Sequence, residues 1–142
     1  MEQHTIFDPF FAMILLTFVV WVYMYSKRIP FIRSGVLTPE QLTNPHAFVA
    51  ASPPAVSNPS DNLKNLFEMP VLFYALVSYV YVTDQVDATH LVAAWIFVVF
   101  RALHSLVHCT FNLVILRFWL YFVATLALAV IAVRAGLTAF AA

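Results

Sequence analysis

The chain has 142 residues, of which 63% are hydrophobic and only 10% are charged, and its formal net charge is zero. An ordinary soluble domain is about half apolar and about a quarter charged, so this composition excludes a soluble enzyme, a disordered chain and a disulfide scaffold. The neutral charge balance gives no sign of nucleic-acid binding, and a single cysteine excludes an internal disulfide and a multi-cysteine metal site. We therefore expect one membrane domain covering residues 1–142.

Four continuous apolar stretches are each long enough to cross a bilayer, which takes about 20 residues. They cover approximately residues 6–25, 63–82, 89–110 and 113–133. Because the apolar runs are continuous rather than alternating, a transmembrane β-barrel is excluded. The first stretch has no basic segment before it and no small-residue cleavage site after it, so we interpret it as a retained anchor. The sequence thus predicts an all-α integral membrane protein, a bundle of four spanning helices.

The first connection, residues 26–62, is long, whereas the second is a short acidic segment and the third, near residues 111–112, is a tight turn. Five prolines between residues 39 and 59 predict that the long connection lacks regular structure. Near its end, Asn58-Pro59-Ser60-Asp61 resembles a stop followed by the N-cap of the second spanning helix.

Basic residues near the span ends indicate the orientation of the bundle. The side of the first connection and of the third turn carries Lys27, Arg28, Arg33, Lys64 and Arg117. The opposite side has only Arg134. Because Lys and Arg are enriched in cytoplasmic loops, we expect the first connection to be cytoplasmic and both termini to be non-cytoplasmic.

Ionisable side chains inside the predicted spans are unusual, since a central charge costs about 2.5–3.5 kcal/mol on insertion scales and is often functional. Five of them lie in the half of the bilayer near the first connection: Glu68, Arg101, His104, His108 and Arg117. The spacing i, i+3, i+7 places Arg101, His104 and His108 on one helix face. Glu68 is the one carboxylate at a depth that could neutralise Arg101, so we expect these two residues to form an ion pair.

The residues alone leave several interpretations open. The pair of Glu68 and Arg101 could simply lock two helices together, and Arg117 could simply anchor the fourth helix at the interface. His104 and His108 could hold a divalent metal together with Glu68, although Arg101 beside them disfavours a cation. Alternatively, the cluster binds a small anionic or zwitterionic ligand whose reaction partner dissolves in the membrane.

Two motifs carry a resemblance to a known family. The run Asn65-Leu66-Phe67-Glu68-Met69-Pro70 matches an Asn-x-x-Glu motif closely followed by proline. The third helix has Arg101-x-x-His104, and Arg117 follows sixteen residues after Arg101. Together with the four spans and the long first connection, they make the chain resemble the MAPEG family, membrane-associated proteins in eicosanoid and glutathione metabolism, and within it the microsomal glutathione transferases.

The resemblance implies a homotrimer that binds glutathione between neighbouring subunits near the cytoplasmic side. It implies that glutathione, as co-substrate, is held by Arg28, Asn65, Glu68, Arg101, His104 and His108. Arg117 matches the arginine that stabilises the glutathione thiolate, so it is the expected catalytic residue. The implied activity is the attack of this thiolate on lipophilic electrophiles or lipid hydroperoxides, and we expect no metal.

The chain departs from the family pattern at two positions. Asp61 stands where the family often has arginine, and His108 stands where it commonly has tyrosine. The alternative interpretation is therefore a non-catalytic subunit of this kind that serves a structural role in a larger membrane assembly.

Overall fold

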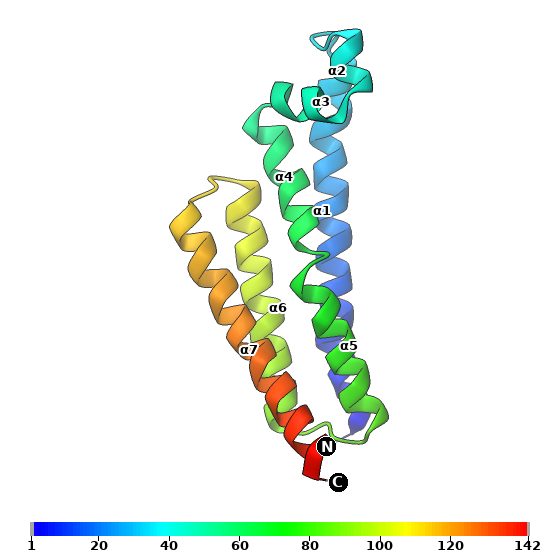
Figure 1. Cartoon of the computed structure of the whole chain (residues 1–142), viewed down its shortest axis with the longest axis vertical. Coiled ribbons are helices and arrows are strands. Elements are labelled where there is room, and N and C mark those ends of the chain that lie inside the picture. The colour runs from blue at the N-terminus through cyan, green and yellow to red at the C-terminus, as the bar shows by residue number, and fades with distance from the viewer. Residues whose placement is uncertain (1, 142) are drawn as a thin grey trace.

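The computed structural model describes residues 2–141, and in that range it consists of helices and their connections without a strand (Figure 1). Four helical segments are long and apolar enough to cross a membrane: Gln3–Arg33, Pro54–Val82, Ala88–Cys109 and Val114–Ala141. The predicted all-α protein with four spanning helices is thereby confirmed. The first segment comprises a short 3₁₀ turn, η1 (Gln3–Ile6), and α1 (Phe7–Arg33); the third is α6 (Ala88–Cys109) and the fourth is α7 (Val114–Ala141).

The spans run alternately up and down, so both termini lie at one end of the bundle (Figure 1). We call this the terminal end, and the opposite end, which carries α2 (Pro39–Thr43), α3 (Pro45–Ala51) and the α6–α7 turn, the loop end. Helix α6 lies at the centre of the bundle. Half of the residues in its most apolar stretch are buried, against 22–28% of those in the other spans. The core includes Phe73 and Phe97, whose rings stack with centroids 4.6 Å apart.

The expectation that residues 26–62 lack regular structure is wrong. Helix α1 continues through Arg28 to Arg33, and α2, α3 and α4 (Pro54–Asn65) occupy most of the remainder. The reason is the register of the prolines: Pro39, Pro45 and Pro54 each occupy the first position of a helix. Proline is tolerated there because that position has no intrahelical partner for an N–H group and the fixed φ already suits a helix.

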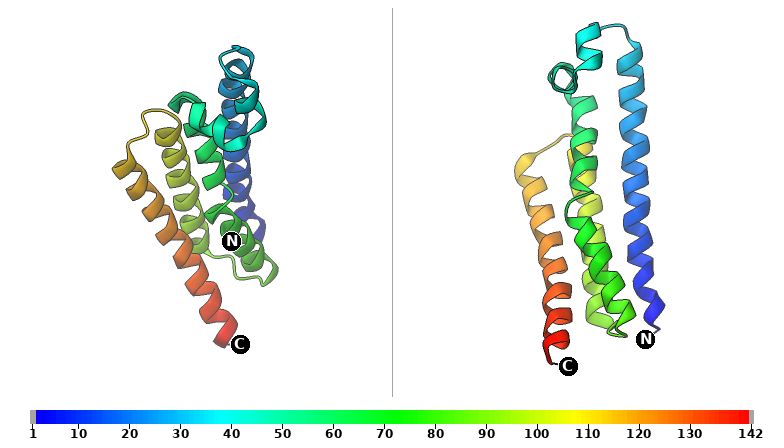
Figure 2. Two further views of the ribbon diagram at one scale, coloured as in Figure 1. Left: turned by 45° about the horizontal axis from the view of Figure 1, so that its top comes forward. Right: turned by 45° about the vertical axis from the view of Figure 1, so that its right-hand side comes forward.

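The predicted start of the second spanning helix at Asn58-Pro59-Ser60-Asp61 is also wrong, since α4 begins earlier and contains Pro59 in its second turn. The second span is instead interrupted at residues 66–68, between α4 and α5 (Met69–Val82), and Figure 2 shows the two parts as one path with a break. Pro70 explains the position of this break, because it has no N–H to donate to the carbonyl of Leu66 and its ring crowds that turn. Asn65 therefore lies just before this break and Glu68 at its end, rather than in the first two turns of the span.

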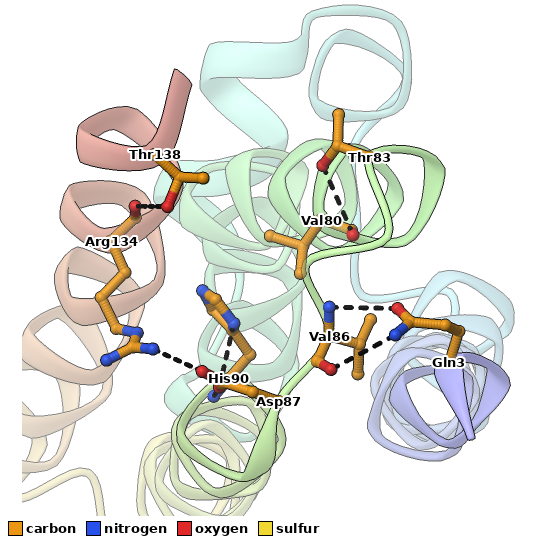
Figure 3. Close-up of polar contacts among 8 residues, drawn as sticks. All are labelled: Gln3, Val80, Thr83, Val86, Asp87, His90, Arg134 and Thr138. Carbon is orange, nitrogen blue, oxygen red and sulfur yellow. Dashed lines mark hydrogen bonds and ion pairs between the residues drawn. The ribbon is translucent and has the colours of Figure 1, made fainter. Parts of the chain in front are cut away.

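At the terminal end, polar contacts join the α5–α6 connection to η1 of the first span, to α6 and to α7 (Figure 3). The side-chain amide of Gln3 accepts a hydrogen bond from the Val86 N–H at 3.1 Å and donates one to the Val86 carbonyl at 3.4 Å. The next residue, Asp87, caps α6 by accepting from the His90 N–H at 2.8 Å and forms an ion pair with Arg134 of α7. The α5–α6 connection thus fixes the ends of α1, α6 and α7 relative to one another.

Candidate functional site

The break in the second span creates the first contact of the site. In an unbroken helix the Asn65 carbonyl would accept the N–H of residue 69, but here it accepts a hydrogen bond from Arg101 Nη2 at 2.8 Å. Arg101 lies in α6, two turns before the loop end, and its side chain is completely buried. The backbone carbonyl that the break leaves without a helical partner therefore accepts its hydrogen bond from the buried guanidinium of Arg101.

The expected ion pair between Glu68 and Arg101 is not formed among residues 2–141. Glu68 is exposed on the surface of the single chain, because the break turns residue 68 away from α6. The guanidinium of Arg101 lies instead 5.4 Å from the ring centroid of Tyr121, which is within the range of a cation–π contact. Two of its nitrogens, Nε and Nη1, have no hydrogen-bond partner among residues 2–141, so Arg101 keeps a capacity for further hydrogen bonds.

His104 and His108 continue the same face of α6 toward the loop end, and both are 3% exposed, as the i, i+3, i+7 spacing predicts. His104 Nδ1 lies 3.0 Å from the backbone carbonyl of Arg117 in α7. Because a carbonyl only accepts hydrogen bonds, this nitrogen carries the proton. The rings of the two histidines meet edge to face with centroids 5.6 Å apart. In the part of the chain that the structure describes, His104 Nε2 and His108 Nδ1 have no hydrogen-bond partner.

Arg117 is in the first turn of α7, half-buried, and its guanidinium donates to the side chain of Asn112. Asn112 has φ of +49°, the left-handed conformation that asparagine adopts more readily than most residues, and so it closes the predicted tight turn. The Asn112 amide also donates to Asn58 Oδ1 at 3.0 Å, which links the turn to α4. Arg117 is thus held by side chains within the bundle rather than extended freely toward the interface.

The fold therefore brings together, near the loop end, site residues from three spans: Asn65, Arg101 and Arg117, with both histidines. Arg28 lies apart from this cluster. Its guanidinium lies 4.7 Å from the ring centroid of Phe48, beside a hollow between α1, α3 and α4 that also contains Asp61 and Lys64. Arg28 forms no ion pair within the described residues.

Four residues of this region were missed by reasoning from the sequence: Asn58, Asn62, Asn112 and Tyr121. The side-chain amides of Asn58 and Asn112 bond to each other and to Arg117, and that of Asn62 donates to Cys109 Sγ of α6. Tyr121 lies against the guanidinium of Arg101. A signal was present, because Asn58, Asn62 and Asn65 follow an i, i+4, i+7 spacing and therefore share one face of α4. Amides repeated along one face at a membrane boundary indicate contacts between helices.

The donor set suits an anion better than a metal. It contains two arginines and two imidazoles, and neither arginine is paired with a carboxylate in the part of the chain that the structure describes. In the same residues, no three His, Cys, Asp or Glu side chains come together as metal ligands. A buried cation without a counter-charge is costly, so a carboxylate or thiolate that reached this cluster would gain strong electrostatic stabilisation.

Comparison with known proteins gives one match. The family model of the MAPEG family matches residues 9–137, which is nearly the whole chain. No curated protein and no solved structure matches the chain. The matched residues include the second and third spans completely, most of the first and fourth, and every residue of the cluster, and the chain therefore belongs to the MAPEG family.

Proposed function

We propose that this protein is a membrane glutathione transferase or peroxidase that activates the glutathione thiolate for attack on lipophilic electrophiles or lipid hydroperoxides. Membership of the MAPEG family supports this proposal. The observation that carries it is the buried, unpaired state of Arg101: a cation that contacts Asn65 yet has two free nitrogens needs an anionic partner. Glutathione brings two carboxylates and a thiol to such a site.

In this proposal Arg28, Asn65, Glu68, Arg101, His104 and His108 bind glutathione, and Arg117 stabilises the thiolate. The protein works as a homotrimer in which a neighbouring subunit completes each site, and its loop end faces the cytoplasm. A charged side chain at the depth of Glu68 is costly against lipid, so its exposure in the single chain supports an assembly that covers it.

The thiol chemistry requires a positive charge near the sulfur. A thiol with a pKa near 8.5 is only about 3% ionised at pH 7, and lowering this pKa by two units takes about 2.7 kcal/mol of preferential thiolate stabilisation. A half-buried arginine at a helix N-terminus provides charge of the right sign, and the helix dipole adds to it. Arg117 has this position in the first turn of α7.

The experiment is a titration of bound glutathione by the ultraviolet absorbance of its thiolate. In Arg117→Ala we expect the thiol of bound glutathione to ionise at higher pH than in the wild type, and turnover with a lipophilic electrophile to fall about 10–100-fold, which corresponds to about 1.4–2.7 kcal/mol. Arg33→Ala is the matched control, because Arg33 is an exposed basic residue at the end of α1. Identical titrations of the wild type and Arg117→Ala would show that Arg117 is only an anchor.

One observation favours a second candidate function, a non-catalytic subunit of a membrane assembly. Arg101 already serves the fold by bonding to the Asn65 carbonyl at the break, and Asp61 stands where the family often has arginine. This candidate predicts that calorimetry of the purified protein detects no glutathione binding.

A further inference from the structure

A hollow of mixed charge lies at the loop end, where α1, α3 and α4 meet. Its charged walls are two cations, Arg28 and Lys64, and one carboxylate, Asp61, and the hydroxyl-bearing Ser57 and Ser60 lie beside them. The space among them is about 30 Å³, which is room for about two water molecules.

The cations of the hollow are available to a ligand. Lys64 Nζ lies 2.9 Å from Asp61 Oδ1, but both side chains are more than half exposed. An exposed ion pair of this kind is weak and exchanges readily. The guanidinium of Arg28 lies over the ring of Phe48 and forms no ion pair within residues 2–141, so it can take a carboxylate in the two-pronged geometry that arginine favours.

The hollow adjoins the Arg117 cluster through Asp61. Asp61 and Asn65 are one helical turn apart on α4 and therefore share a face. The charge of Asp61 also acts on both His108 and Arg117 across the helix interface. Asp61 thus stands between the hollow and the residues proposed to hold the thiol.

We propose that Asp61, Arg28 and Lys64 bind the α-amino-acid end of the γ-glutamyl group of glutathione, with Asp61 accepting the ammonium group. This inference rests on the proposed function. The ligand ammonium replaces Lys64 on the Asp61 carboxylate, and the released Lys64 joins Arg28 at the ligand carboxylate. The exchange breaks the exposed pair of Lys64 with Asp61 and forms three ion pairs with the ligand. Asp61 then makes the site selective for a thiol that carries a free ammonium group.

The experiment compares two ligands that differ in one group: glutathione and glutaryl-cysteinyl-glycine, in which hydrogen replaces the ammonium. Calorimetry of the full chain in detergent gives both dissociation constants for the wild type, Asp61→Asn and Glu68→Gln. We expect the wild type to bind glutathione about tenfold more tightly than the analogue, a difference of about 1.4 kcal/mol. Asp61→Asn should lose this preference while its affinity for the analogue stays the same.

Glu68→Gln is the matched control, since it removes the other carboxylate near the site. This variant should bind glutathione and the analogue more weakly by the same factor, and it should keep the tenfold preference for glutathione. Loss of the preference in Glu68→Gln but not in Asp61→Asn would assign the ammonium to Glu68 and overturn the inference. Equal binding of both ligands by the wild type would overturn it while the proposed function stands. If the wild type binds neither ligand, the proposed function fails and the inference fails with it.

Discussion

Replacing Arg101 by methionine removes a buried charge while it keeps most of the side-chain volume. The change loses one hydrogen bond from a charged donor to the Asn65 carbonyl, worth about 1.5–3 kcal/mol. It also loses the cation–π contact with Tyr121, worth up to about 2 kcal/mol. In the opposite direction, the variant avoids the desolvation penalty of a buried, unpaired guanidinium, and this penalty is several kcal/mol in a protein interior. The opposing contributions nearly balance, so we expect the free energy of unfolding to change by no more than about 2 kcal/mol.

The assay is thermal unfolding of the detergent-purified protein without ligand, followed by tryptophan fluorescence. At about 3 °C per kcal/mol for a chain of this size, the expected shift of Tm is at most about 6 °C in either direction. Affinity for glutathione should fall at least about tenfold in the same variant, whereas Arg33→Met, on the exposed end of α1, should change neither quantity. A loss of stability near 3–5 kcal/mol would refute the reasoning, because that is the cost of breaking a buried ion pair.

Two further predictions concern the break and the terminal end. In Pro70→Ala the new N–H can bond to the Leu66 carbonyl, so we expect α4 and α5 to join into one helix, with greater protection of residue 70 from hydrogen exchange and weaker glutathione binding. Unchanged exchange there would show that Pro70 does not cause the break. The hydrogen bond from the His90 N–H, aided by the charge of Arg134, lowers the pKa of Asp87. Ionised Asp87 therefore increases the free energy of unfolding at pH values above the pKa that it has in the unfolded chain, which is near 3.9. This contribution is lost as the pH falls through the lower pKa of the folded protein. Tm measured from pH 5 to pH 3 should show this loss in the wild type but not in Asp87→Asn, and equal losses in both would contradict the assignment.

The parts of the fold that depend on composition and helical periodicity could be predicted from the sequence. The four spans follow from the length of the apolar runs, and the structure has them. The shared face of Arg101, His104 and His108 follows from the helical repeat, and all three side chains are buried together. The tight turn near residue 112 could be predicted because only about two residues separate the third and fourth apolar runs.

The parts that depend on the position of a proline within a helix could not be predicted. Proline ends a helix in most interior positions but begins one at its first position, and composition does not distinguish the two. Composition alone therefore predicts that Pro39, Pro45 and Pro54 break helices, whereas each of them begins one. Pro70, in contrast, lies where the second span is interrupted, whereas the sequence pattern predicts a start of that span near Pro59 and no interruption within it.

The break also decides which side chains can meet. In a continuous helix Asn65 and Glu68 would share a face, and a carboxylate facing α6 would pair with Arg101. The interruption separates them: the Asn65 carbonyl faces Arg101, while the Glu68 side chain is exposed. Within residues 2–141 there is thus a buried cation without a paired carboxylate, Arg101, and an exposed anion at bilayer depth, Glu68. Both are unfavourable in an isolated subunit, and a neighbouring subunit that covers Glu68 together with an anionic ligand that reaches Arg101 relieves both at once. Assembly and ligand binding are therefore expected to be coupled, each strengthening the other.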